Sequence, residues 1–260
     1  MNRENERAGK EVSLLFVTWR KNRMEQEVRL NKFLSEAGVC SRREADRMVE
    51  KGRILVDGVP AQMGQKVRAS QKIEVDHKRI QIEEEKVLLA FNKPRGIVCT
   101  TSKKDKDNIV DYINYGKRIY PIGRLDKDSE GLILLTNQGE LVDKILRGSN
   151  YHEKEYIVTV NKKITPEFLR AMGSGVPILD TVTRPCELEQ IGPRTFRIIL
   201  TQGLNRQIRR MCEYFSYRVI ELTRVRVMNI RLGRLKSGTY RKIVGKELEE
   251  LVKLLEKQNS

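Results

Sequence analysis

Three polar segments of the chain carry residue types that could do chemistry. Gly123–Gly131 reads GRLDKDSEG and precedes an apolar strand, Glu153–Tyr156 opens another strand, and Gly203–Met211 leads into a helix. Polar loops on a rigid scaffold often hold functional groups. The first segment offers carboxylates, the second a phenol ring that can stack on a nucleobase, and the third an arginine that needs a carboxylate partner if it is partly buried.

Each segment also has an ordinary structural interpretation, which the residue types leave open. Asp126 could shape a turn or cap a helix, the usual role of an aspartate in a loop. Asp128 and Glu130 continue an acidic run, but it lacks the alternating oxygens and turn glycine of an EF-hand. Tyr156 could be a core residue of its strand. Arg209 lies at the edge of an apolar helical stripe, and a partly buried arginine needs a carboxylate, so any ion pair would satisfy it.

The helix expected near residues 205–216 positions the third segment. Asn205 is expected to cap its N-terminus. An apolar stripe that includes Ile208 and Cys212 faces inward, so Arg206 and Arg210 are expected to face solvent.

These segments need a scaffold of strands and helices. Apolar runs predict strands at residues 87–91, 132–135, 155–160, 196–200 and 219–230, and helical periodicity predicts helices near 139–147, 165–172, 205–216 and 246–257. The mixture indicates an α+β domain over residues 87–260.

A smaller module is predicted over residues 28–76. An apolar stripe over residues 30–37 predicts a helix that Gly38 ends, and Ser41–Glu44 reads as a capping box that opens a second helix. Strands are expected at residues 53–56 and 73–75, with a turn at Asp57–Gly58. Residues 77–86 are predicted as a linker and residues 1–27 as a mobile extension.

The two helices of this module carry basic and polar side chains on their outer faces. They could grip RNA phosphates together with the backbone donors of a helix N-terminus, or they could simply be solvated, and the spacing does not decide. The residues are Arg29, Lys32, Ser41, Arg42, Arg43 and Arg47.

The charge distribution favours a polyanionic partner. The 260 residues hold 51 Lys and Arg against 35 Asp and Glu, a net charge of +16. The surplus lies inside the patterned region, because residues 201–243 hold 11 basic and 2 acidic side chains whereas residues 1–27 hold 6 and 5. A nucleic-acid surface explains this better than solubility or a basic tail.

Cysteine and histidine usage predicts no metal site and no disulfide framework. The cysteines are widely spaced and only two histidines are present, so the cysteines are interpreted as buried residues of a reducing compartment. The apolar run from Val12 to Trp19 is too short for a membrane span and lacks a signal-peptide cleavage site. We therefore expect a cytoplasmic protein. The residues concerned are Cys40, Cys99, Cys186, Cys212, His77 and His152.

Two sets of motifs resemble known families. VRLNKFLSEAGVCSRREADRMVEKGRILVDGVPAQMGQKV, residues 28–67, resembles the S4 RNA-binding domain, which implies an RNA partner but no reaction. GRLDKDSEGLILLTN, EKEY and NRQIRRM, in this order, resemble the bacterial pseudouridine synthases that join an S4 domain to an RsuA-like catalytic domain. Finer features such as NKPRGIV and GVPILDTVT are similar to the F-type branch of that family, which acts on large-subunit ribosomal RNA. The resemblance implies an α+β fold, with a central antiparallel sheet in the catalytic domain.

The resemblance also implies residue roles. Asp126 would be the catalytic aspartate, Tyr156 would pack against the target base and take part in proton transfer, and Arg209 would pair with the aspartate. Arg124 would fill the gap left by a flipped-out uridine or hold that nucleotide. The remaining candidate substrate contacts are Asn205, Arg206, Gln207 and Arg210.

The implied reaction isomerises uridine to pseudouridine. The N1–C1′ bond breaks, the uracil rotates, and C5 rejoins C1′, so neither a cofactor nor a metal is expected. Attack at C1′, assisted elimination to a glycal and attack at C6 are all compatible with one aspartate. A monomer acting on large-subunit ribosomal RNA is expected, and transfer RNA stays open as a further substrate.

Two other functional classes stay open. A non-catalytic RNA-binding or ribosome-assembly factor would bind RNA and leave it unchanged. A glycosidase or nuclease is a weaker alternative, because the sequence shows neither two well-spaced carboxylates nor an acidic metal cluster.

Overall fold

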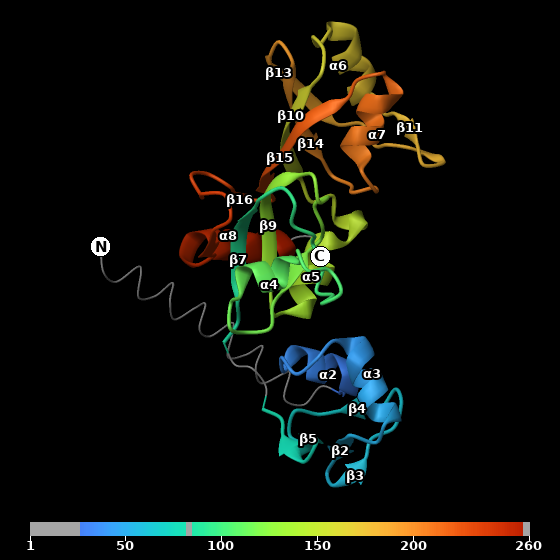
Figure 1. The fold of residues 1–260 in the computed structure, drawn as a ribbon, viewed down its shortest axis with the longest axis vertical. Coiled ribbons are helices and arrows are strands. Elements are labelled where there is room, and N and C mark those ends of the chain that lie inside the picture. The colour runs from blue at the N-terminus through green and yellow to red at the C-terminus, as the bar shows by residue number, and fades with distance from the viewer. Residues whose placement is uncertain (1–26, 82–84, 257–260) are drawn as a thin grey trace, which may run out of the picture. The chain divides into compact units, whose positions relative to one another are not determined.

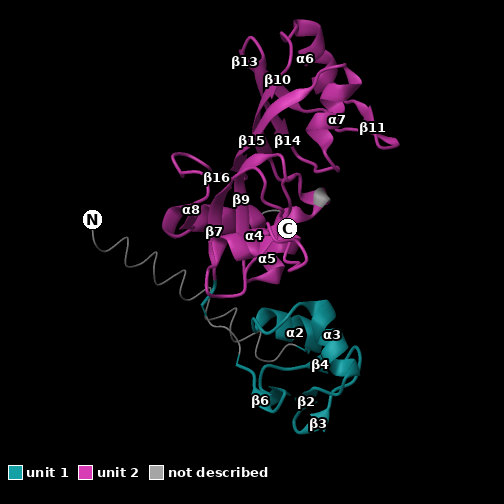
Figure 2. Cartoon of the chain, in the orientation of Figure 1, with its two compact units in different colours: residues 1–86 teal, residues 87–260 magenta. Residues whose placement is uncertain are grey.

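The chain divides between residues 86 and 87 into two units, coloured separately in Figure 2. The computed structural model describes residues 27–81 and 85–256. The extension predicted over residues 1–27 lies outside the described residues except for Glu27.

The first unit combines two helices with short strands (Figure 1). Its elements are β1 (Val28–Arg29), α2 (Leu30–Glu36), α3 (Arg42–Glu50), β2 (Ile54–Val56), β3 (Val59–Pro60), β4 (Lys66–Val67), β5 (Ile73–Val75) and β6 (Lys78–Arg79). β1 pairs with β4, and the other strands form an antiparallel sheet in the order β3-β2-β5-β6. Because β6 pairs with β5, the sheet extends into residues 77–86, and the prediction that this whole segment is a linker was wrong.

The predicted ends of the two helices are confirmed. The Ser41 hydroxyl accepts a hydrogen bond from the Glu44 N–H at 3.2 Å, which caps α3. Gly38 follows α2 with a φ of +80°, a left-handed conformation that glycine adopts without a steric penalty. Leu34 and Ala45 are fully buried between these helices and the small sheet, so this unit has its own apolar core.

The second unit is built on one large sheet (Figure 1). Its strands are β7 (Leu88–Lys93), β8 (Tyr120–Ile122), β9 (Glu130–Thr136), β10 (Lys154–Val160), β11 (Pro177–Ile178), β12 (Thr181–Val182), β13 (Glu187–Gly192), β14 (Thr195–Leu200), β15 (Val219–Val227), β16 (Ile230–Arg231) and β17 (Tyr240–Lys242). Its helices are α4 (Ile109–Ile113), α5 (Gly139–Leu146), the 3-10 helix η1 (Gly148–Asn150), α6 (Pro166–Gly173), α7 (Gln207–Tyr214) and α8 (Gly245–Glu256).

The large sheet is antiparallel except at one pair. Its main path runs β13-β14-β10-β15-β9-β7-β17, with β16 added to β15 and β8 to β9. β15 and β9 pair in parallel at Thr223–Arg224 and Glu130–Gly131. β11 and β12 form a separate hairpin. The expected antiparallel central sheet is therefore present, with one parallel junction at its centre.

Strand β9 shows why this sheet forms. Leu132 and Leu134 point into one apolar cluster with residues of α5 and α8, while Ile133 and Leu135 point into a second cluster that includes residues of α6 and α7. Both faces are covered, which explains the unbroken apolar run in the sequence. No described helix is both long and apolar enough to cross a bilayer.

The strand predicted over residues 219–230 was too long. β15 ends at Val227, Met228 has a φ of +53°, and β16 then folds back to pair with β15. The turn consists of Met228 and Asn229 and contains no glycine or proline, so the only turn-favouring residue in the sequence there is a single asparagine.

Candidate active site

Asp126 lies in the loop between β8 and β9. Within this loop the Ser129 N–H donates to the Asp126 carbonyl at 3.1 Å. The Gly96 N–H donates to the Lys127 carbonyl at 2.8 Å, and the Leu125 N–H donates to the Cys99 thiol at 3.3 Å. The loop is thus held by two contacts with the segment that follows β7, and the Asp126 side chain is only 30% exposed.

Arg209, in the first turn of α7, reaches this loop. Its Nη2 donates to the Asp128 carbonyl at 3.2 Å and to the buried Ser129 hydroxyl at 3.1 Å, and lies 3.3 Å from Asp128 Oδ2. Its Nε lies 3.8 Å from Asp126 Oδ2, an ion pair without a hydrogen bond. The partly buried arginine therefore has the acidic partners that its position requires.

Arg206 turns toward the same carboxylates. Its Nη1 lies 3.4 Å from Asp128 Oδ1 and 3.8 Å from Asp126 Oδ2, so the prediction that it faces solvent was wrong in direction, although the side chain is 42% exposed. The backbone explains the difference, because Arg206 has a φ of +51° and stands just before α7. Two guanidinium groups thus face two carboxylates.

The left-handed conformation of Arg206 also shows that the prediction of Asn205 as the N-cap was wrong. Arg206, not Asn205, occupies the N-cap position of α7, and its side chain makes no capping bond. The Asn205 carbonyl and side-chain oxygens accept hydrogen bonds from Arg210 at 3.1 and 3.3 Å. Gln207 is buried, with its side-chain oxygen bound to the Leu204 N–H at 3.0 Å. Asn205 and Gln207 therefore support their own loop, whereas Arg124 is exposed.

Tyr156 lies on the sheet face that α7 covers. The ring is 9% exposed and belongs to the apolar cluster that contains Leu125 and Ile208. A β-bulge between Glu155 and Tyr156 interrupts the pairing with β15, and such bulges re-aim side chains. Within the described residues, no hydrogen bond or ion pair connects Tyr156 to Asp126 or Arg209. The structure therefore places Tyr156 in the core beneath this region rather than in direct polar contact with it.

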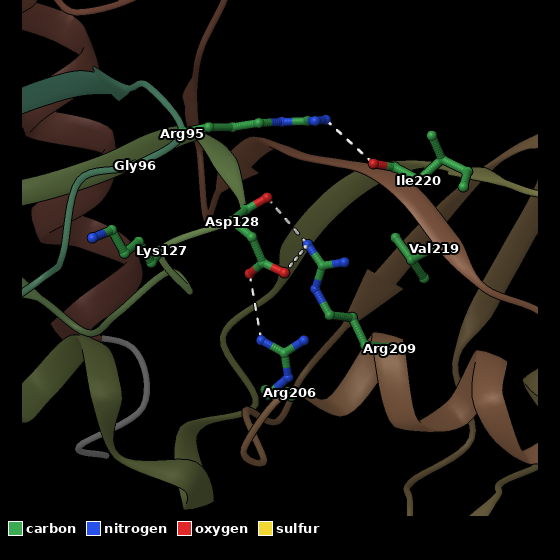
Figure 3. A pocket seen from close by; sticks show the side chains of 8 residues that line it. All are labelled: Arg95, Gly96, Lys127, Asp128, Arg206, Arg209, Val219 and Ile220. Atoms are coloured by element: carbon green, nitrogen blue, oxygen red, sulfur yellow. Dashed lines mark hydrogen bonds and ion pairs between the residues drawn. The ribbon is translucent and has the colours of Figure 1, made fainter.

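A cavity of about 580 Å³ opens beside the paired charges, with a volume typical of a small-molecule site (Figure 3). Four of its eight lining residues are cationic and one is acidic. The lining residues are Arg95, Gly96, Lys127, Asp128, Arg206, Arg209, Val219 and Ile220. Such a lining suits an anionic ligand that carries an uncharged ring.

Sequence reasoning assigned no role to Arg95 or Lys127. Arg95 Nε lies 3.6 Å from Glu130, and its Nη2 donates to the Ile220 carbonyl at 3.5 Å, so it spans the cavity between β9 and β15. The available signal was positional: Pro94 to Gly96 directly follow a buried strand, where polar loop residues often act in a site.

Lys93 supports the loop that carries Arg95 and Gly96. It is fully buried, and its Nζ donates to the carbonyls of Pro94 and Ile97 at 2.8 and 2.9 Å. Burial lowers the pKa of this ammonium, and nearby groups, among them the thiol of Cys99 and the carboxylates of Asp128 and Asp126, act in the opposite direction. A buried cation thus lies under the acidic loop.

In residues 27–81 and 85–256, no three His, Cys, Asp or Glu side chains gather into a group that could hold a metal ion. Three cysteines are buried as predicted, and Cys186 is partly exposed. Burial raises the pKa of the Cys212 thiol to about 12, so this thiol is unreactive at neutral pH.

Comparison with known proteins gives consistent matches for both units. The family model described as RNA pseudouridylate synthase matches residues 87–214, and the S4 domain model matches residues 28–73. A Salmonella typhi protein named dual-specificity RNA pseudouridine synthase RluF is 55% identical over 234 residues, which cover 89% of this chain and 81% of that protein. The Bacillus subtilis ribosomal large subunit pseudouridine synthase B is 35% identical over 232 residues, covering 86% and 95%. A crystal structure of a pseudouridylate synthase superposes with a TM-score of 0.63 at 26% identity, covering 87% of this chain and 99% of that one.

Proposed function

The chain belongs to the RNA pseudouridylate synthase family and carries an S4 domain, and from this we propose that it isomerises uridine in large-subunit ribosomal RNA with Asp126 as nucleophile. Its activity class is that of an RNA pseudouridine synthase, an isomerase. The observation that supports the assignment of Asp126 is its position: the carboxylate lies 3.8 Å from the guanidinium groups of both Arg206 and Arg209, in the loop that lines the cationic cavity.

The side chains of the site have different roles in this proposal. Neither Arg206 nor Arg209 forms a hydrogen bond to the Asp126 carboxylate, so its oxygen lone pairs remain available to the nucleotide. Arg95, Lys127 and Arg206 would contact the phosphates of a flipped-out uridine, and Arg124 would contact the nucleotide or the gap it leaves. Tyr156 would pack beneath the base.

The reaction then requires no change in oxidation state. The glycosidic N1–C1′ bond breaks, the uracil turns within the cavity, and a C5–C1′ bond forms as the proton on C5 leaves. A proton ends on N1, so the atoms of uridine and pseudouridine balance. Asp126 assists either by bonding transiently to the nucleotide or by taking a proton from the sugar.

The names of the relatives support an RNA substrate from the ribosome. The Bacillus subtilis relative is named for the ribosomal large subunit, and the Salmonella typhi relative is named for dual specificity. We take large-subunit ribosomal RNA as the principal substrate and transfer RNA as the second class to test. A monomer acting in the cytoplasm is part of this proposal.

The S4 unit would hold RNA phosphates near the ends of its helices. Arg29, Arg42 and Arg43 are exposed. Arg47 is in a surface ion pair with Glu44 at 3.1 Å, which RNA phosphates could replace at little cost. Lys32 lies 3.8 Å from the Glu36 carboxylate, which is only 10% exposed, so Lys32 would contact a phosphate while it keeps this partner. The Ser41 hydroxyl caps α3, so its contribution would be the oriented helix N-terminus.

The decisive experiment compares Asp126→Asn with Asp128→Asn. We expect Asp126→Asn to lower single-turnover pseudouridine formation by about 10⁴-fold or more, with RNA affinity little changed. Asp128 lies between the same two arginines, so Asp128→Asn controls for the altered charge and should retain a measurable rate. Appreciable turnover by Asp126→Asn would remove the nucleophile assignment.

A second measurement tests the substrate and the activity together. Pseudouridine would be mapped across ribosomal and transfer RNA from cells with and without this protein. We expect loss of modification at one or more large-subunit positions. RNA binding by the purified chain without any conversion would instead favour a non-catalytic RNA-binding factor.

A further inference from the structure

An exposed aromatic ring lies against a guanidinium outside the proposed catalytic group. Tyr151, between η1 and β10, is 58% exposed. The Arg184 Cζ lies 4.1 Å from the centre of its ring, within the range of a cation–π interaction. The Arg184 backbone is itself fixed, because its N–H donates to the Gln202 side chain at 3.1 Å.

Chain connections limit the distance between this pair and the cavity. Gln202 precedes Arg206 by four residues, a reach of at most about 14 Å along an extended chain. Arg206 contacts Asp126 at 3.8 Å and lines the cavity. On the other side, Tyr151 stands three residues before the first residue of β10, the strand that carries Tyr156.

The exposure of Tyr151 argues against a purely structural role. An aromatic side chain that only anchors a loop gains most by burying its ring, as Phe168 and Phe196 do in the adjacent core. Tyr151 instead leaves more than half of its surface in solvent while Arg184 covers part of it. A flat, partly covered ring next to a positive charge is the arrangement on which unpaired nucleobases stack.

We propose that Tyr151 and Arg184 form a stacking subsite for an unpaired RNA base that neighbours the target uridine. The ring supplies the stacking surface, and the guanidinium holds the ring and attracts the adjoining phosphate. Because every base presents a π-face, the subsite recognises an unstacked nucleotide rather than a particular base. This inference rests on the proposed function, since it assumes an RNA strand that enters the cavity.

The test combines protein variants with modified RNA. The probe is a short RNA stem–loop centred on the uridine that the wild-type chain modifies in large-subunit ribosomal RNA, or poly(U) RNA if no such uridine is found. Affinities of wild type, Tyr151→Ala and Tyr151→Phe would be measured by fluorescence anisotropy. We expect Tyr151→Ala to weaken binding by about 5- to 100-fold, and Tyr151→Phe, which keeps the ring, to stay within about threefold of wild type.

Abasic substitutions in the same RNA locate the base. Removing the stacked base should weaken wild-type binding at one flanking position and leave Tyr151→Ala unaffected there, because the partner ring is already absent. Additive losses at every position would overturn the subsite, as would equal affinity of Tyr151→Ala and wild type.

These outcomes are separable from failure of the proposed function. If the wild-type chain forms no pseudouridine, the proposed function fails, and the binding comparison on poly(U) still decides whether Tyr151 stacks on RNA. If pseudouridine forms and the variants bind equally, the subsite alone is wrong.

Arg184→Lys tests the guanidinium of the subsite, because it keeps the positive charge but loses the planar group. We expect this variant to bind the RNA more weakly than wild type, with a smaller loss of affinity than Tyr151→Ala shows.

Discussion

Removing the guanidinium of Arg209 should loosen the Asp126 loop far more than removing that of Arg206. In Arg209→Met the loop loses two hydrogen bonds from a buried charged donor, to the Asp128 carbonyl and the Ser129 hydroxyl. Each such bond contributes about 1.5–3 kcal/mol, and at 3.2 and 3.1 Å both are long, so the lower value applies and the two total about 3 kcal/mol. The ion pairs add little, because the Asp126 and Asp128 side chains are 30% and 51% exposed.

Arg206→Met is the matched control. Its side chain is 42% exposed, and its contacts to Asp128 and Asp126 measure 3.4 and 3.8 Å. A partly exposed pair of this kind contributes at most about 1 kcal/mol. Both variants remove one positive charge and a contact to the Asp128 carboxylate, so a difference between them reports the two hydrogen bonds that only Arg209 donates, to the Asp128 carbonyl and the Ser129 hydroxyl.

Scanning calorimetry of the full chain measures the difference. For a unit the size of residues 87–260, 1 kcal/mol shifts Tm by about 2–4 °C. Arg209→Met should therefore lower the Tm of this unit by about 6–12 °C, and Arg206→Met by less than about 4 °C. Equal shifts, or a shift in Arg209→Met below that of the control, would show that the loop does not depend on Arg209.

The remaining predictions concern stability and RNA binding. Burial lowers the pKa of Lys154 in the folded protein from 10.5 to about 8. Between these pH values the unfolded chain binds more protons than the folded one, so the stability of the wild type rises with pH. Lys154→Met should be more stable than wild type below pH 8, and its stability, measured by urea denaturation, should depend less on pH. A Cβ on Gly131 would lie 2.4 Å from a backbone oxygen of β15, whereas one on Gly233 meets nothing within 4 Å, and both have a positive φ. Gly131→Ala should therefore cost about 1–3 kcal/mol more than Gly233→Ala, and equal costs would contradict the close approach. Arg43→Ala should reduce the slope of log RNA affinity against log salt concentration by about 0.7. Arg53 is paired with Asp76, so the control variant Arg53→Ala should leave this slope unchanged. Identical slopes for the two variants would remove Arg43 from the RNA-binding face.

Local patterns predicted local structure well. The cap at Ser41, the helix end at Gly38 and the apolar strand at residues 132–135 each depend on neighbouring residues, and the structure confirms them. The errors fall where backbone conformation departs from side-chain preference. Arg206 and Met228 adopt a left-handed φ without being glycine, so the start of α7 and the end of β15 were misplaced.

The candidate active site could be predicted only in part from the sequence. From their residue types alone, Asp126 could equally have shaped a turn or capped a helix, and Arg209 could have formed an ion pair with any carboxylate. The family resemblance, rather than the spacing, suggested that the two residues pair. Arg95 and Lys127 were missed because their positions depend on the parallel junction of β9 and β15, which joins segments far apart in the chain. No local pattern encodes that pairing.

The proposed mechanism needs the loop that carries Asp126 to be held in place while the carboxylate itself stays free to react, and the contacts of the nearby cations meet both needs. Lys93 and Arg209 direct their hydrogen bonds to backbone carbonyls and one hydroxyl, at 2.8 to 3.2 Å, and so hold the loops in place. The Asp126 carboxylate receives only the longer 3.8 Å contacts. A direct hydrogen bond from a guanidinium would stabilise the ground state of a nucleophile and occupy its lone pairs. Cations that anchor the backbone instead leave the oxygens of the carboxylate free for the substrate of the proposed reaction.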